Sequence, residues 1–262
     1  MDGKVAVITG AGGGLGRATA LELSRRGARV VLVDRAGDDA RRTAELLPGE
    51  SLVVEADVTR EDEVAGYLEA ARTRFGSIDL HHLNAGIVGT LTPLPQIPLS
   101  EFEDVTAVNL RGQFLGMRGA FREYAAQGAG GSIVVTTSIH GLRASADLPV
   151  YQMTKHGLVG LVQAGAVYGG PLGVRVNGVA PGLIATRFHD THSTDAMRKA
   201  MVDQTPLRRE GTPADVAEGI QFYRDLLGVE VITIFPHMLG DSYKKANEQM
   251  TRFMEEVVPL LG

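Results

Sequence analysis

The stretch KVAVITGAGGGLG, residues 4–16, decides the fold. Its first half is short, apolar and rich in β-branched residues, which is typical of a buried strand. Apolar residues then recur at helical spacing up to about Arg26. A glycine-rich turn between a strand and a helix is the context that a phosphate-binding loop requires, because the helix start offers free N–H groups to an anion. In this reading Gly10 permits the turn, Gly14 lets the backbone approach a pyrophosphate, and Gly16 allows close helix–strand packing.

The same alternation continues along the chain. We expect strands at residues 29–34, 51–56, 78–83, 132–137, 174–180 and 229–235, and helices at residues 39–47, 61–75, 99–127, 150–168 and 213–227. Ser100 is the expected N-cap of the helix over residues 99–127. Long helices between strands require crossover connections, hence parallel strands. The sequence therefore predicts one α/β domain, residues 1–228, with a doubly wound parallel sheet of about seven strands and helices on both faces. Residues 229–262 form an atypical end, with a last strand and an extra amphipathic helix.

Composition excludes several classes of protein. The chain has 262 residues, a formal net charge of −5 and no cysteine, so disulfides and thiolate chemistry are excluded. The acidic balance disfavours nucleic-acid binding. Apolar runs are too short for a membrane span, and the start of the chain does not resemble a signal peptide. We expect a cytoplasmic protein. Its histidines lack metal-ligand spacing, so we expect no metal.

Asp34 ends the second expected strand and indicates the cofactor. A carboxylate there accepts hydrogen bonds from ribose hydroxyls and repels a 2′-phosphate, which favours NAD over NADP. Gly12 and Gly13 carry no basic side chain for such a phosphate, although Arg35 is adjacent.

Further motifs follow in order. They are Thr9-Gly10-xxx-Gly14-Leu15-Gly16, Asp57-Val58, Asn84-Ala85-Gly86, Val108-Asn109, Ser138 in TSxxG, Tyr151-xxx-Lys155, and Pro181-Gly182 with Thr186. Together they resemble the short-chain dehydrogenase/reductase family, although Leu83 replaces the usual first Asn of its NNAG element. The resemblance covers residues 4–226 and implies a Rossmann fold.

The resemblance also implies the roles of the site residues. The catalytic set is Asn109, Ser138, Tyr151 and Lys155. The NAD-binding set is Gly10, Gly14, Leu15, Gly16, Asp34, Asp57, Val58, Asn84, Ala85, Gly86, Tyr151, Lys155, Pro181, Gly182 and Thr186. In the family the Asn holds a water near the lysine, and the lysine also binds the nicotinamide ribose. The implied reaction is hydride transfer between the cofactor and a small-molecule alcohol or ketone.

Tyr151 and Lys155 share one helix face because they are four residues apart. We expect the lysine ammonium to lower the tyrosine pKa, so that Tyr151 serves as general acid and base. Ser138 would hydrogen-bond the substrate oxygen. His140 and Phe188 are candidate substrate contacts, with residues 183–209 as a lid.

Other readings stay open. A non-catalytic dinucleotide sensor on the same fold usually lacks the Tyr or Lys, and epimerising or dehydrating relatives are usually longer. The resemblance implies a homodimer or homotetramer, with one interface made by the helices at residues 99–127 and 150–168. His81 and His82 lie in an expected strand, where a structural role is more common than a catalytic one.

Overall fold

The computed structural model describes residues 1–143, 148–185, 195–203, 205, 208–212 and 215–216. Their strands are β1 (Val5–Thr9), β2 (Arg29–Asp34), β3 (Ser51–Glu55), β4 (Leu80–Leu83), β5 (Gly131–Thr136) and β6 (Val174–Val179). They form one parallel sheet in the order β3-β2-β1-β4-β5-β6. The doubly wound α/β fold is thus confirmed. The expected seventh strand, residues 229–235, and the tail beyond it lie outside the described residues.

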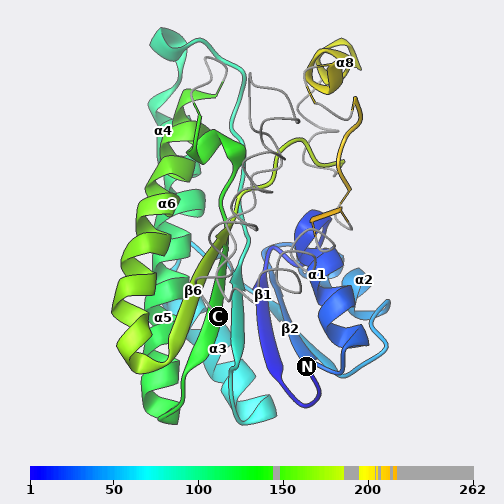
Figure 1. Cartoon of the computed structure of the whole chain (residues 1–262), viewed down its shortest axis with the longest axis vertical. Helices are drawn as coiled ribbons and strands as arrows, with labels where there is room; N and C mark the ends of the chain where they lie inside the picture. The colour runs from blue at the N-terminus through cyan, green and yellow to red at the C-terminus, as the bar shows by residue number, and fades with distance from the viewer. Residues whose placement is uncertain (144–147, 186–194, 204, 206–207, 213–214, 217–262) are drawn as a thin grey trace, which may run out of the picture.

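Helices cover the sheet in two layers. Their bounds are α1 (Gly14–Arg25), α2 (Gly37–Ala44), α3 (Glu61–Phe75), α4 (Leu99–Thr106), α5 (Gln113–Gln127), α6 (Pro149–Gly169) and α8 (Asp195–Asp203). Short 3-10 turns occupy Leu94–Gln96, Ile139–Gly141 and Gly170–Leu172. In Figure 1, α4, α5 and α6 lie along one side of the sheet and α1 and α2 along the other.

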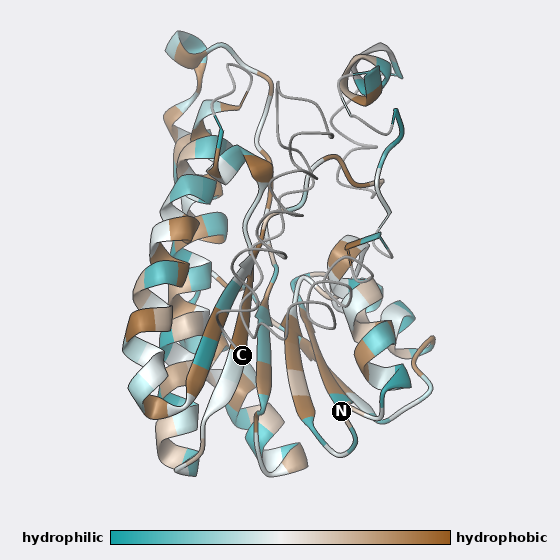
Figure 2. Cartoon of the chain, in the orientation of Figure 1, coloured by the Kyte–Doolittle hydropathy of each residue, from teal (hydrophilic) through white to brown (hydrophobic). Residues whose placement is uncertain are grey.

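Both faces of the central strands are buried, as a sheet covered on two sides requires. On β2, Val31 and Val33 join the apolar cluster shared with α3 and α5. Val30 and Leu32, which alternate with them, join the cluster shared with α1 and α2. Figure 2 shows this as hydrophobic colour along the strands and mixed colour on the helices.

The helix expected over residues 99–127 differs from the expectation in two ways. Its start is Leu99, and Pro98 is the N-cap in place of Ser100. Pro98 already has an extended backbone, and its carbonyl accepts from the N–H of Glu101 at 3.0 Å, so Ser100 falls inside the first turn. The helix then widens into a π-helical segment, Ala107–Gly112, before continuing as α5. Such segments are rare and often mark functional sites.

Strand β4 carries two buried histidines, His81 and His82. The His81 ring meets Tyr67 edge-on, with Nε2 3.2 Å from the tyrosine oxygen. Nε2 of His82 lies 3.0 Å from Oγ1 of Thr136. Burial lowers the pKa of His81 to about 3, with a further lowering from His82, and burial lowers the pKa of His82 to about 4. Both rings are therefore neutral in the folded chain at neutral pH.

This predicts acid sensitivity. Above pH 6.5 a histidine is neutral in the folded and unfolded states, so stability does not depend on it. As the pH falls below 6.5, the unfolded chain takes up a proton that the folded chain excludes, and the loss of stability continues down to the folded pKa. At pH 5 each histidine then costs about 2 kcal/mol relative to pH 7, from about 1.5 pKa units at 1.36 kcal/mol each.

Urea unfolding at pH 7 and pH 5 measures this loss. His81→Phe should be less stable than wild type at pH 7, because it strips the Tyr67 hydroxyl of its partner. The free energy of unfolding of His81→Phe should nevertheless fall by about 2 kcal/mol less than that of wild type between pH 7 and pH 5. An identical pH dependence in the two proteins would contradict the prediction.

Candidate active site

The glycine-rich loop folds back on itself at the carboxyl end of β1. Gly10 has φ +66°, a conformation that favours glycine. A Cβ on Gly16 would collide with the carbonyl oxygen of Gly10, so only glycine lets α1 approach this closely. Helix α1 begins without a side-chain cap, and its N-cap is Gly13. Its first N–H groups are thus not occupied by a capping side chain, which suits a pyrophosphate.

Thr9 and Asn84 fasten this loop to the end of β4. Oγ1 of Thr9 accepts from the N–H of Asn84 at 2.9 Å and from that of Ala85 at 3.1 Å. In return, Nδ2 of Asn84 donates to the carbonyls of Thr9 at 3.0 Å and Gly10 at 3.3 Å. Two neighbouring strand ends are therefore joined in both directions.

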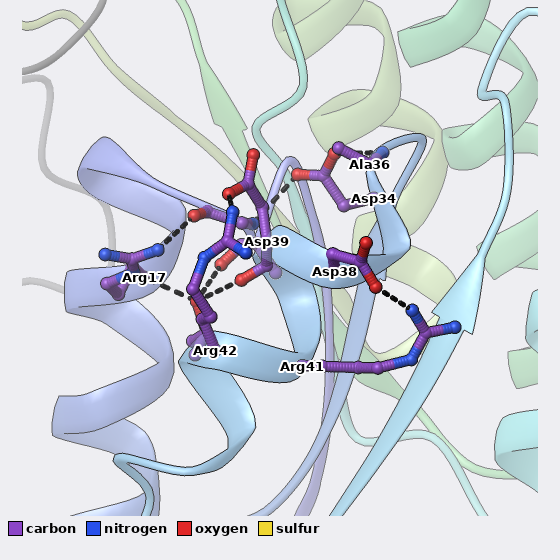
Figure 3. Close-up of polar contacts among 10 residues, drawn as sticks. Arg17, Asp34, Ala36, Asp38, Asp39, Arg41 and Arg42 are labelled. Atoms are coloured by element: carbon purple, nitrogen blue, oxygen red, sulfur yellow. Dashed lines mark hydrogen bonds and ion pairs between the residues drawn. The ribbon is translucent and has the colours of Figure 1, made fainter.

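Asp34 lies at the carboxyl end of β2, beside the same loop (Figure 3). Oδ2 accepts from the N–H of Gly12 at 2.8 Å, and Oδ1 accepts from that of Ala36 at 2.9 Å. Each oxygen of an ionised carboxylate has a further acceptor site. The carboxylate is thus fixed in place and can still accept from a diol.

Three arginines near Asp34, which are Arg17, Arg41 and Arg42, are engaged by other groups (Figure 3). Arg17 donates through Nε to the hydroxyl of Thr43 at 3.0 Å and through Nη2 to the carbonyl of Gly12. Arg41 pairs with Asp38, and Arg42 pairs with Asp39. The contacts of Arg17 attach α1 to α2 and to the glycine loop, whereas the other two pairs lie within α2.

Asp57 and Val58 follow β3 on the same edge of the sheet. Asp57 Oδ1 accepts from the N–H of Thr59 at 2.9 Å. Burial opposes ionisation of Asp57, yet its pKa lies below the usual value because Thr59 donates two hydrogen bonds and Arg35 adds positive charge. Val58 packs against Gly112, because a Cβ added to Gly112 would lie 2.9 Å from a methyl carbon of Val58.

Three of the expected catalytic side chains gather at the ends of β5 and α6. Ser138 follows β5, and Tyr151 and Lys155 lie on the first turns of α6; all three are buried. Lys155 Nζ lies 5.5 Å from the centre of the Tyr151 ring, and a hydrogen bond links Tyr151 with Ser138. Lys155 Nζ itself donates to the carbonyl of Thr136 at 2.7 Å.

The electrostatics of this pair differ from the expectation. Burial raises the pKa of Tyr151 to about 12, with the hydrogen bond to Ser138 opposing it. Burial also lowers the pKa of Lys155 to about 7. Desolvation disfavours both charged forms and outweighs the attraction between them. The expected lowering of the tyrosine pKa is therefore wrong for the chain alone.

Asn109, the fourth expected catalytic residue, lies fully buried in the π-helical segment. Its amide donates to the carbonyl of Ile87 at 2.7 Å and accepts from the N–H of Ile87 at 2.8 Å. It also contacts the hydroxyl of Thr154 at 3.3 Å. A Cβ on Gly86 would meet both Asn109 and Lys155, so the loop after β4 passes close to these two expected catalytic residues.

The remaining expected residues divide into two groups. Leu15 lies half-buried on α1, and Pro181 and Gly182 follow β6, where the Pro181 carbonyl accepts from the N–H of Ile139 at 3.0 Å. Thr186 and Phe188 lie outside the described residues, as do the other residues of 186–194 in the expected lid, whereas α8 belongs to the described part of that lid. The start of the lid meets the chain just after its end, because Ile184 forms a parallel bridge with Gly211.

His140 lies close to the catalytic tyrosine. Its ring is half-buried, and its centre lies 6.0 Å from that of Tyr151 in an edge-on arrangement. The His140 N–H donates to Ser138 Oγ at 3.2 Å.

Sequence reasoning missed several polar side chains that support the site. The Thr136 hydroxyl donates to Asn84, the Thr154 hydroxyl accepts from Asn109, and Gln113 donates to the carbonyl of Ala85. Only the position of Thr136 at a strand end, two residues before Ser138, gave a signal in the sequence.

The chain is similar to known proteins over most of its length. The family described as enoyl-(acyl carrier protein) reductase matches residues 10–223. Levodione reductase from Leifsonia aquatica is 37% identical over 231 residues, which are 84% of this chain and 86% of that protein. The chain belongs to the short-chain dehydrogenase/reductase family.

Two further comparisons support this assignment to the short-chain dehydrogenases. Cis-4-hydroxycyclohexanecarboxylate dehydrogenase from Sinomonas cyclohexanicum is 38% identical over 221 residues, covering 84% of this chain and 88% of that protein. The crystal structure of a levodione reductase superposes with a TM-score of 0.82 at 33% identity, covering 90% of this chain and 97% of that one. The chain is therefore an oxidoreductase of alcohols and ketones that uses a nicotinamide cofactor.

The geometry fits such a cofactor. The uncapped start of α1 suits the pyrophosphate, Asp34 suits a ribose, and Lys155 lies beside the loop that follows β4. Within the described residues, no helix is both long and apolar enough to span a membrane.

Gly16 offers a direct test of the cofactor loop. Gly16→Ala should weaken NADH binding at least ten-fold, because the new methyl group forces the Gly10 carbonyl to move. Gly13→Ala is the matched control, because a Cβ on Gly13 meets nothing within 4 Å and its φ of −168° is open to any residue. Fluorescence titration with NADH measures both. Equal binding by the two variants would rule out the role of Gly16.

Proposed function

We propose that this chain interconverts a secondary alcohol and the matching ketone, with NAD as the preferred cofactor and Tyr151 as the proton-transferring group. The observation that carries the proposal is the buried cluster of Ser138, Tyr151 and Lys155 beside the loop after β4. A proton donor, a hydroxyl hydrogen-bonded to it and a cation are brought together at the sheet edge that carries the glycine loop.

Bound NADH supplies the hydride that reaches the carbonyl carbon, and NAD accepts it in the reverse direction. Tyr151 Oη gives its proton to the carbonyl oxygen during reduction and takes the hydroxyl proton during oxidation. Ser138, hydrogen-bonded with Tyr151, also faces the reacting oxygen and stabilises its developing charge. Lys155 stabilises the phenolate whenever Tyr151 has given up its proton.

Burial makes Tyr151 a proton donor in its resting state. A phenol with a pKa of about 12 is neutral at pH 7, which is the form that ketone reduction needs. In the oxidation direction the phenolate forms beside the Lys155 ammonium, which the Thr136 carbonyl holds at 2.7 Å. The same residues therefore serve both directions.

The preference for NAD rests on Asp34 and its neighbours. The carboxylate is fixed by two backbone N–H groups where an adenosine ribose would lie. A 2′-phosphate at that place would meet a like charge. Arg17, Arg41 and Arg42 are already bound to other groups and are not arranged to offset it.

Substrate recognition is proposed to involve His140. The centre of its ring lies 6.0 Å from that of Tyr151, near enough for a substrate bound at the tyrosine to reach it. One relative's name contains a hydroxyl on a cyclohexane ring, which is a cyclic secondary alcohol. Cyclic secondary alcohols and ketones are therefore the first compounds to screen, by NADH fluorescence.

A homodimer or homotetramer is also proposed. Large apolar side chains are exposed on the layer formed by α4, α5 and α6, among them Phe102, Phe114, Met153 and Tyr168. Such side chains favour burial between subunits.

Cofactor preference has a simple test. Wild type should bind NADH at least ten-fold more tightly than NADPH in parallel fluorescence titrations. Asp34→Asn should reduce the difference in affinity between NADH and NADPH, because it removes the negative charge that repels the 2′-phosphate. Asp38→Asn is the matched control, because Asp38 is an exposed residue of the same turn that pairs with Arg41. Tighter binding of NADPH by wild type would overturn the preference and direct attention to Arg35.

The catalytic assignment has a second test. Tyr151→Phe should lower turnover about 10²–10⁴-fold, the range for loss of a general acid or base, and leave the NADH dissociation constant within about two-fold. Lys155→Ala should damage both turnover and binding. Tyr168→Phe, an exposed tyrosine on the same helix, should change neither. Wild-type turnover in Tyr151→Phe would exclude the mechanism, and a wild type without turnover on any compound would favour the non-catalytic reading.

A further inference from the structure

A chain of hydrogen bonds leads from β4 to the glycine-rich loop. Nε2 of His82 lies 3.0 Å from Oγ1 of Thr136, and Thr136 Oγ1 donates to Oδ1 of Asn84 at 3.0 Å. Nδ2 of Asn84 then reaches the carbonyls of Thr9 and Gly10. The chain joins three neighbouring strands, because His82 lies on β4, Thr136 on β5 and Thr9 on β1.

Each bond in this chain has a single possible direction. Asn84 must present its NH₂ group to the two carbonyl oxygens, since those accept only, and so its own oxygen faces Thr136. The Thr136 hydroxyl has one hydrogen, which goes to that oxygen. His82 Nε2 must therefore be the donor to Thr136, which makes His82 the neutral Nε2–H tautomer.

The surroundings of His82 agree with this tautomer. The ring is buried, and Nδ1 has no hydrogen-bond partner in the part of the chain that the structure describes. A proton on Nδ1 would thus lack an acceptor. Burial alone lowers the pKa of His82 to about 4, which keeps the ring neutral.

Thr136 also touches the catalytic cluster through its backbone. Its carbonyl accepts from Lys155 Nζ at 2.7 Å, while its hydroxyl serves Asn84. Asn84 in turn packs against the glycine-rich loop. A Cβ added to Gly10 would lie 3.1 Å from Asn84 Nδ2, and one added to Gly16 would lie 2.9 Å from it. Thr136 therefore connects Lys155, through its backbone carbonyl, with Asn84 and the glycine-rich loop, through its hydroxyl.

We propose that His82 is a positioning residue for the dinucleotide site: by donating to Thr136 it fixes the hydroxyl that orients the Asn84 amide against the glycine-rich loop. The inference rests on the proposed nicotinamide dinucleotide binding. His82 touches neither the cofactor loop nor the reacting groups itself, and acts through Thr136 and Asn84.

The neighbouring histidine provides a matched control. His81 is equally buried, but its ring binds Tyr67 of α3 and has no bond to Thr136 or Asn84. If His82 only fills space in the sheet, replacing either histidine should have the same effect on cofactor binding.

The experiment measures NADH affinity and urea unfolding for paired variants. His82→Leu and Thr136→Val should each weaken NADH binding about five- to twenty-fold, and the double variant should be no weaker than the worse single variant, because both break one chain. His82→Gln and Thr136→Ser keep the donor or the hydroxyl and should bind within about two-fold of wild type. His81→Leu should lower the unfolding midpoint and leave the NADH affinity within about two-fold.

Several results would overturn the inference. Wild-type affinity in folded His82→Leu, equal weakening in His81→Leu, or additive losses in the double variant would each do so. Should His82→Leu fail to fold, the Thr136→Val and Thr136→Ser pair decides by the same comparison of NADH affinity.

A readout without cofactor completes the test. In ¹⁵N-labelled wild type, His82 should show a protonated Nε2 and a bare Nδ1 from pH 5 to pH 8, and the opposite tautomer would contradict the bond chain. A wild type that binds neither NADH nor NADPH would overturn the proposed function together with this inference. A wild type that binds NADH alongside an equally tight His82→Leu would overturn the inference alone.

Discussion

The two-way bond between Thr9 and Asn84 is the interaction on which the site depends. It holds the carboxyl ends of β1 and β4 together through hydrogen bonds of 2.9 Å and 3.0 Å. The glycine loop leaves from one of these ends, and the loop that passes over Lys155 leaves from the other. A shift between the two strands would move the proposed pyrophosphate site relative to the proposed proton-transfer residues. Parallel strands make this possible, because all their carboxyl ends lie at one edge of the sheet.

Much of the fold was predictable because its signals are local. Apolar runs such as residues 29–34 place the strands, and Gly10 and Gly16 mark a turn in which a larger residue at either position would be strained or would collide with the backbone. The π-helical segment was not predictable, since its sequence, AVNLRG, reads as ordinary helix. Ser100 was a misleading capping signal because Pro98, two residues earlier, already supplies the extended residue and the first carbonyl acceptor.

The motif residues of the site were predictable from the sequence, but the hydrogen bonds that hold them in place were not. Tyr151 and Lys155 are four residues apart, so their shared helix face follows from the sequence. Thr136 and Asn84 are separated by 52 residues, and their hydrogen bond follows only from the pairing of β4 with β5. The pKa of Tyr151 was misjudged for a similar reason. Charge can be read from residue types, but desolvation depends on what the rest of the chain packs around the ring.

Burial gives the catalytic pair a balance that the sequence does not reveal. Tyr151, with a pKa of about 12, is neutral at pH 7, and Lys155, with a pKa of about 7, is about half protonated there, so the cluster carries less charge than an exposed lysine would give it. In the proposed mechanism, charge that appears on the substrate oxygen would arise in a poorly solvated place, where the hydroxyl of Ser138 and the ammonium of Lys155 would act on it more strongly than in water. The Thr136 carbonyl steadies that ammonium without neutralising it, because it contributes a dipole and no charge. A carboxylate at the same position would hold Lys155 more tightly but would cancel the charge that the phenolate needs.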